Sequence, residues 1–150
     1  MTIARHPARR SRGFSLIETM VATGIAGVLS RIAYPNLEGH LLKARRTDAL
    51  VALMQAQLPQ ERFRANNASY GSLAEAGVHS VSSAGLYTVR VTSHGADGYV
   101  VLASATGAQA RDASCRHLRL TLADATLAYA SGADATTAND AALNRKCWSR

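Results

Sequence analysis

The first long hydrophobic stretch of the chain covers residues 14–33 and stops at Pro35. Its roughly 20 residues would form a helix of about 30 Å, which matches the thickness of a bilayer core. Polar residues weaken the stretch, with Glu18 near its start and Arg31 near its far end. Arg31 can extend to the membrane interface, whereas a carboxylate within the apolar zone normally needs a partner. We predict a membrane anchor of modest strength.

A second helical pattern covers residues 37–64. Five apolar residues recur at spacings of 7, 4, 3 and 7, which trace one face of a helix: Leu42, Ala49, Leu53, Ala56 and Phe63. The basic run 43–46 falls largely off that face and is most simply its solvated side, although it could also bind DNA or lipid headgroups. Pro59 should kink or restart this helix, because proline lacks a backbone donor.

The second half of the chain favours a small sheet. Residues 72–84 are expected to form a linking loop, and residues 86–92 and 99–103 an antiparallel hairpin around an Asp-Gly step. Residues 117–122 alternate strictly and predict a third strand, whose leucine face only the amphipathic helix can cover. Residues 131–144 show no periodicity and are expected to be a surface loop. The fold class is therefore α+β.

Charge is concentrated at the N-terminus. The chain has 150 residues, 47% of them hydrophobic, and a formal net charge of +7, which allows one modest domain and argues against general disorder. Four arginines lie in the first 13 residues, and without them the remaining charge is about +3. A basic stretch before an apolar one also suggests a secretory signal peptide, but no Ala-x-Ala site closes the apolar run.

Enzymatic chemistry finds no support in the residue pattern. The five histidines are scattered, and no nucleophile elbow, phosphate loop or His-Glu-x-x-His pair occurs. Asp134 and Asp140 are too few to make a calcium loop. We expect no catalytic residue, no metal and no cofactor. Cys115 and Cys147 could be free thiols, although a disulfide is favoured if the chain crosses a membrane into an oxidising compartment.

The segment from Arg12 to Glu18, followed by the apolar helix and Pro35, resembles the N-terminus of a type IV pilin precursor. The resemblance implies that a prepilin peptidase cuts between Gly13 and Phe14 and methylates Phe14. It assigns subunit assembly to Glu18, which would pair with the new amino group of Phe14, and a helix bend to Pro35. Glu18 could instead simply complement the helix dipole.

The same resemblance implies an organisation for the whole chain. It divides into a cleaved basic leader (1–13), a hydrophobic transmembrane and filament-core helix (14–35) and a periplasmic or extracellular globular domain (36–150). The implied type IV pilin fold is a long N-terminal helix packed on a small antiparallel sheet, with a C-terminal loop bounded by a Cys115–Cys147 disulfide. Arg31 replaces the small apolar residue usual before the proline, which favours a minor subunit.

The expected function is a structural subunit of a type IV pilus, with other pilin subunits, the prepilin peptidase and the assembly machinery as partners. It would reside in the bacterial inner membrane, with its N-terminus in the cytoplasm, before it enters the extracellular pilus. Two alternatives remain open: a type II secretion pseudopilin, and a competence-type pilin that binds DNA. The basic residues that could contact DNA lie in the last third of the chain: Arg111, Arg116, Arg119, Arg145, Lys146 and Arg150.

Overall fold

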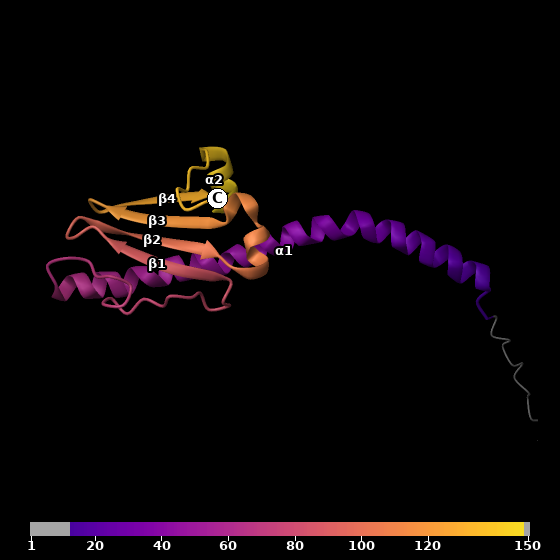
Figure 1. The fold of residues 1–150 in the computed structure, drawn as a ribbon, viewed down its shortest axis with the longest axis horizontal. Helices are drawn as coiled ribbons and strands as arrows, with labels where there is room; N and C mark the ends of the chain where they lie inside the picture. The colour runs from indigo at the N-terminus through magenta and orange to yellow at the C-terminus, as the bar shows by residue number, and fades with distance from the viewer. Residues whose placement is uncertain (1–12, 149–150) are drawn as a thin grey trace, which may run out of the picture. The chain divides into compact units, whose positions relative to one another are not determined.

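The computed structural model describes residues 13–148, so the predicted leader, apart from Gly13, lies outside the described residues. One helix, α1 (Leu16–Asn66), opens the fold. The chain divides into two compact units, and the second begins at Glu38, within α1. The first unit consists of the beginning of α1. The second unit contains the rest of α1 and every other element (Figure 1).

Helix α1 is longer and more regular than the sequence predicted. It continues through both Pro35 and Pro59, so the expectation that Pro59 restarts the helix was wrong. Proline at position 59 removes a single backbone hydrogen bond. Ala56 and Gln60 on either side of it are buried, and the Gln60 side chain both donates to the Gly71 carbonyl and accepts from the Gly71 N–H. Packing on both sides therefore holds the turn in helical conformation.

The second unit contains a four-stranded antiparallel sheet in the order β1-β2-β3-β4 (Figure 1). Its strands are β1 (Tyr87–Ser93), β2 (Gly98–Ala105), β3 (His117–Ala123) and β4 (Thr126–Gly132). The predicted hairpin and third strand are confirmed, and residues 72–84 form the expected loop. The fourth strand was not predicted. The tight turn that leads into it is made by Asp124 and Ala125, at φ of 46° and 60°. These two residues stand where a hairpin turn usually has Asn-Gly, so the sequence lacks the usual turn signal.

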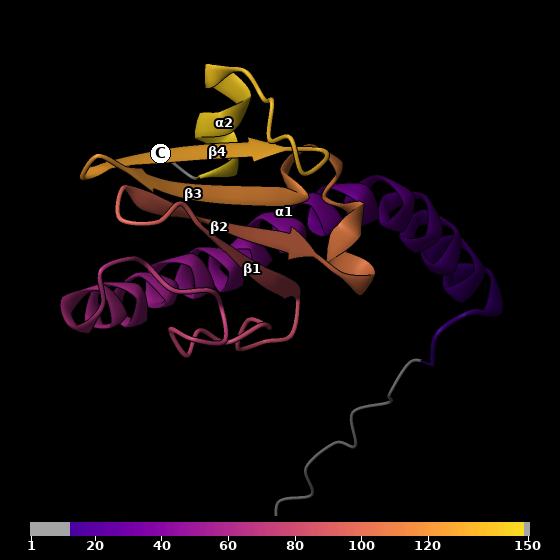
Figure 2. The ribbon, with the colours of Figure 1, turned by 60° about the vertical axis from the view of Figure 1, so that its left-hand side comes forward.

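The core lies between the sheet and one face of α1, as Figure 2 shows. Three residues of the predicted helix face, Ala49, Leu53 and Ala56, are essentially fully buried. They meet the inward side chains of the sheet, among them Leu118 and Leu120, which are also fully buried. The prediction that the helix covers the leucine face of the third strand is therefore confirmed. Apolar burial of this kind is the main stabilising contribution to a small fold.

Two short 3₁₀ helices, η1 (Gly107–Arg111) and η2 (Ala113–Cys115), connect β2 to β3, and a last helix, α2 (Ala141–Cys147), ends the fold. The sequence predicted a loop over residues 131–144, so α2 corrects that interpretation. Asp140 begins the helix by accepting a hydrogen bond from the Leu143 backbone N–H at 2.8 Å. This N-cap satisfies a backbone donor that a helix start otherwise leaves free.

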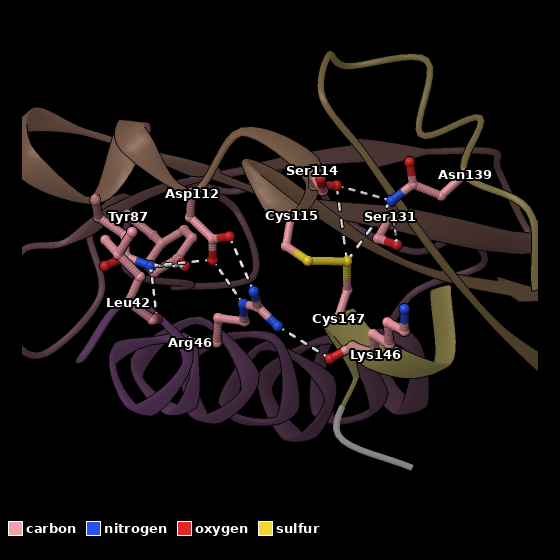
Figure 3. A network of polar contacts seen from close by, with 11 residues as sticks. Leu42, Arg46, Tyr87, Asp112, Ser114, Cys115, Ser131, Asn139, Lys146 and Cys147 are labelled. Atoms are coloured by element: carbon pink, nitrogen blue, oxygen red, sulfur yellow. Dashed lines mark hydrogen bonds and ion pairs between the residues drawn. A yellow bond between two sulfur atoms is a disulfide. The ribbon is translucent and has the colours of Figure 1, made fainter. Parts of the chain in front are cut away.

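A buried ion pair joins α1 to the C-terminal region (Figure 3). The Arg46 guanidinium donates to both carboxylate oxygens of Asp112, at 2.6 and 2.9 Å, and a third N–H donates to the Lys146 carbonyl at 2.9 Å. The side chains of Arg46 and Asp112 are only 13% and 7% exposed. The sequence assigned Arg46 to the solvated side of the helix, and this was wrong, because Asp112 supplies a distant partner that the local pattern does not reveal.

A second group of hydrogen bonds lies next to this ion pair. The Gln109 side chain donates to the Leu42 carbonyl and to the Tyr87 hydroxyl, each at 3.0 Å (Figure 3). Burial raises the pKa of Tyr87 to about 12, so its hydroxyl keeps its proton at physiological pH. Cys115 and Cys147 form a disulfide beside this group, which links η2 to α2. These contacts hold α1, β1, the 3₁₀ helices and α2 together.

The Arg46–Asp112 pair yields a prediction about stability. Replacement Arg46→Ala leaves a buried carboxylate without its partner, which costs about 3–5 kcal/mol of unfolding free energy. Lys43→Ala, at an exposed position one turn earlier on the same helix, should change stability by no more than about 0.5 kcal/mol. Urea denaturation of the purified chain measures both. Equal stability of the two variants would contradict a structural role for the pair.

Candidate functional site

The N-terminal residues singled out by the sequence lie at the very start of α1. Gly13 and Phe14 precede the helix, which begins at Leu16. Glu18 falls in its first turn, and the backbone N–H groups of Glu18 and Thr19 both donate to the Ser15 carbonyl, at 3.0 and 3.2 Å. Glu18 is therefore positioned to interact with the positive end of the helix dipole. It is also exposed, so it is accessible to a group from outside this turn.

The first part of α1 presents an almost wholly apolar surface. Its large hydrophobic side chains are exposed by 56–85% and include Leu16, Ile17 and Val28. Hydroxyl groups on the same helix bond back to backbone carbonyls, Thr23 to Thr19 at 2.9 Å and Ser30 to Ala26 at 2.7 Å. Because these hydroxyls are satisfied within the helix, they do not oppose its burial against an apolar partner.

Across the described residues, no helix is both long and apolar enough to cross a membrane, unlike the anchor predicted for residues 14–35.

The basic residues that the sequence offered as DNA contacts are dispersed. Arg111 pairs with Glu38 at 3.1 Å, and Arg116 donates to the Ala110 carbonyl at 3.0 Å. Arg145 and Lys146 lie in the last turn of α2, and Arg150 is outside the described residues. These side chains therefore come from different elements, and two of them have partners within the chain. Only Arg119 stands on a strand, in the middle of β3.

The sheet brings Arg119 together with a residue that the sequence did not single out. The register pairs Arg90 of β1 with Leu102 of β2, and Leu102 with Arg119 of β3, so the three side chains form a row across one face of the sheet. This outer face is the one turned away from α1. The alternation in residues 86–92, which groups Arg90 with two threonines, was the signal that could have revealed it.

Strands β1–β4 contain no Asp or Glu, so the side chains that they place on the outer face are basic, hydroxyl or apolar; one carboxylate that acts on this face is that of Asp134, which lies close to His117. A neighbouring row pairs Ser104 with His117, whose Nδ1 lies 2.9 Å from the Ser104 hydroxyl. Burial, followed by the nearby Arg116 charge, lowers the pKa of His117, so the imidazole is largely neutral at pH 7. The Arg119 Nε is buried without a hydrogen-bond partner among the described residues. The positive charge of this face therefore comes from two arginines, and a ligand with acceptor oxygens would suit it.

Two family models match the chain. One, described as type IV minor pilin ComP, DNA uptake sequence receptor, matches residues 35–119. The other, described as the prokaryotic N-terminal methylation motif, matches residues 8–34. Together they cover residues 8–119, which include α1, β1, β2 and the start of β3.

Individual relatives are named as a type II secretion system core protein and as a type IV major pilin. The chain is 32% identical over 91 residues to type II secretion system core protein G of Pectobacterium carotovorum, covering 61% of this chain and 58% of that protein. It is 30% identical over 92 residues to the protein of the same name from Klebsiella pneumoniae, covering 61% and 65%. It is also 32% identical over 65 residues to type IV major pilin protein PilA of Myxococcus xanthus, covering 43% and 30%.

The matches thus span at most about two thirds of these curated relatives. The minor pilin model, however, covers more than half of the present chain, and the long helix on a four-stranded antiparallel sheet with a C-terminal disulfide is the type IV pilin fold. The protein therefore belongs to the type IV minor pilin family that this model describes.

Proposed function

We propose that this protein is a minor pilin, a structural subunit of a type IV pilus. In this proposal a prepilin peptidase cuts after Gly13 and methylates Phe14, and the subunit then assembles through its N-terminal helix. The observation that carries the proposal is the match of residues 8–34 to the methylation motif, at the point where an exposed apolar helix begins. The cut would fall two residues before that helix, between exposed residues without regular secondary structure.

The roles of the remaining N-terminal residues follow from the same proposal. Residues 1–13 form the leader, residues 14–35 the filament-core helix and residues 36–150 the globular domain, with Pro35 bending the helix near the boundary. Glu18 pairs with the amino group of Phe14 on a neighbouring subunit. The partners are other pilin subunits, the prepilin peptidase and the assembly machinery of the inner membrane.

We further propose that the subunit resides in the inner membrane before assembly, with its N-terminus in the cytoplasm, and in the extracellular pilus afterwards. The methylation motif supports this location, whereas the hydropathy of the described helix does not. Assembly into a secretion pseudopilus is the alternative supported by the relatives named core protein G. The minor pilin model and the C-terminal disulfide favour the pilus.

A second candidate function is DNA binding by the same subunit. The description of the family model names a DNA uptake sequence receptor, and the outer face of the sheet combines Arg90 and Arg119 with hydroxyl groups. Guanidinium groups bind phosphate oxygens well, and strands without Asp or Glu add little repulsion of a polyanion. We therefore propose that DNA, if it is the ligand, contacts the outer face of the sheet.

Processing gives the first test of the pilin proposal. In cells that express the prepilin peptidase, the mature wild-type protein should begin at methylated Phe14. Gly13→Val should block the cut, because a branched side chain replaces the smallest residue at the cleavage site, and should leave residues 1–13 attached. Mass spectrometry of the intact chains distinguishes the two. Cleavage of the wild type near Ala33, as by an ordinary signal peptidase, would overturn the proposal.

Assembly tests the role of Glu18. If Glu18 pairs with a buried ammonium group, Glu18→Gln leaves that group unpaired, which typically costs about 3–5 kcal/mol. If it only complements the helix dipole, the loss is about 0.3–1 kcal/mol. We expect the variant to be made normally but to enter pili poorly, measured as its abundance in sheared filaments relative to membranes.

Glu38→Gln is the matched control for this experiment. Glu38 lies on the same helix and pairs with the exposed Arg111, a kind of contact worth at most about 1 kcal/mol. It should therefore leave incorporation unchanged. Wild-type incorporation of Glu18→Gln would show that Glu18 does not carry the assembly role.

DNA binding is tested by the salt dependence of affinity. Each phosphate contact contributes about 0.9 to the slope of log affinity against log salt, so the double replacement of Arg90 and Arg119 by alanine should lower that slope by about 2. The control is Arg62→Ala, an exposed arginine on α1. Fluorescence anisotropy with a labelled duplex gives the slopes. An unchanged slope in the double variant, or an equal change in the control, would exclude the outer face as the binding surface.

A further inference from the structure

The end of the second unit at which the chain enters it is built from three elements. Residues 38–46 of α1 lie against η1, because the Gln109 side chain donates to the Leu42 carbonyl at 3.0 Å. They also lie against α2, because the Arg46 guanidinium donates to the Lys146 carbonyl at 2.9 Å (Figure 3). We call residues 38–46, η1 with its C-cap residue 112, and the last turn of α2 the entry end of the second unit.

Basic side chains dominate the entry end. It contains six Lys and Arg against two carboxylates, a net charge of +4: Lys43, Arg45, Arg46, Arg111, Arg145 and Lys146 against Glu38 and Asp112. Both carboxylates are paired with arginines of the same end, Glu38 with Arg111 at 3.1 Å and Asp112 with Arg46 at 2.6 Å. Asp48, the next carboxylate along α1, accepts hydrogen bonds from backbone N–H groups just before β1, and including it leaves +3.

Three cations of the entry end are available to a ligand. Lys43, Arg145 and Lys146 are exposed, and within the part of the chain that the structure describes they form no ion pair. Lys43 precedes Arg46 by three residues, which puts it on the same side of α1, and Arg46 holds the Lys146 carbonyl. Lys43 and the last turn of α2 are therefore neighbours. We call Lys43, Arg145 and Lys146 the basic patch.

The opposite end of the sheet carries the opposite charge. The turn between β1 and β2 holds Asp97, the turn between β3 and β4 holds Asp124, and neither turn contains Lys or Arg. The Asp124 N–H donates to the Asp97 carbonyl at 3.1 Å, so the two turns lie side by side, at the end of the sheet away from η1 (Figure 1). An anionic surface would therefore attract the entry end and repel the turns, which would orient the second unit.

The order of the chain identifies the anionic surface. The second unit begins at Glu38, directly after the segment 14–35 that we propose to lie in the membrane before assembly. The entry end is thus the part of the second unit that is joined to the membrane segment, and headgroups are the first anions it meets. The segment itself contains Glu18 and Arg31, which weaken an apolar anchor, so a second contact with the membrane adds to its hold.

We infer that the basic patch binds the headgroups of anionic phospholipids while the subunit resides in the membrane. The phosphate oxygens of these lipids accept hydrogen bonds from ammonium and guanidinium groups, and each Lys or Arg near such a surface strengthens binding about fivefold. The inference rests on the proposed membrane location and adds to it a lipid class and the residues that recognise it.

A fluorescence experiment tests the inference on the full chain. Trp148, the only tryptophan in the sequence, follows the basic patch directly and reports on its surroundings. The chain is reconstituted in phosphatidylcholine vesicles with or without about 30% phosphatidylglycerol, and both kinds carry a lipid with a spin-labelled headgroup that quenches tryptophan. Quenching should be about twofold stronger in the anionic vesicles. The excess should vanish in about 1 M salt, where charges are screened within about 3 Å.

Two double variants show whether the basic patch causes this excess. Lys43→Gln combined with Lys146→Gln should reduce quenching in the anionic vesicles to the level seen with phosphatidylcholine alone. Arg62→Gln combined with Arg90→Gln removes the same charge from exposed positions outside the entry end and should keep the excess. Both variants keep the ion pair of Arg46, so both should unfold at the urea concentration that unfolds the wild type.

The possible outcomes separate this inference from the proposed function. Equal quenching in the two kinds of vesicle, or equal loss in the two variants, would overturn the inference, while flotation of the wild type with the vesicles would still support the membrane location. Failure of the wild type to float with either kind of vesicle would overturn that location and the inference with it. If the Lys43 and Lys146 variant instead lowered the salt slope of duplex binding and left quenching unchanged, the basic patch would be a DNA surface, and the lipid inference would fail.

Discussion

Helix α1 has more apolar surface than the small sheet of this chain can cover. The sheet buries Ala49, Leu53 and Ala56 completely, which fixes how the second unit is built. The first turns of the helix, and its back face formed by Val51, Met54 and Leu58, keep large apolar side chains exposed to solvent. Such surface is costly for an isolated chain and is normally covered by association. The architecture is therefore that of a subunit, whose own fold accounts for only one of its apolar faces.

Two kinds of contact attach the C-terminal elements to α1, which lies far away in sequence. Arg46 binds the Asp112 carboxylate and the Lys146 carbonyl at once, and the Cys115–Cys147 disulfide covalently links the same region. The ion pair is well shielded from solvent and doubly hydrogen-bonded, and these conditions allow a buried pair to persist despite its desolvation cost. Crosslinking residues 115 and 147 also removes conformational freedom from the unfolded chain.

Much of the fold followed from local pattern. The helix face through Leu53, the hairpin of β1 and β2 and the strict alternation of β3 were all predicted, because each burial pattern repeats within a few residues. Strand β4 and helix α2 were missed because their signals are weak. The turn before β4 uses Asp124 and Ala125 in left-handed conformations, and α2 is a short helix with a single N-cap residue.

The candidate sites also divide into those that a local sequence pattern predicts and those that depend on contacts between distant segments. Gly13, Phe14 and Glu18 could be proposed from the sequence because the predicted processing motif is contiguous. The partner of Arg46 lies 66 residues away, and the row of Arg90 and Arg119 exists only through the register of β1, β2 and β3. Interactions that depend on which segments meet in space leave no trace in local spacing. The back face of α1 was hidden for a related reason, since an exposed apolar residue on a helix looks like a core residue until the core is known.

The two proposed activities of this subunit use opposite sides of its second unit. Assembly would use the back face of α1 (Val51, Met54 and Leu58) and the groove beside it, which lack Lys and Arg. DNA would bind the outer face of the sheet, whose strands contain no Asp or Glu and which lies on the side away from α1. A subunit held by its helix can therefore keep its sheet exposed to solvent, so that filament assembly and ligand binding do not compete for surface. The chemistry of each face fits this division, because apolar contact drives helix packing whereas guanidinium groups need access to phosphate oxygens in water.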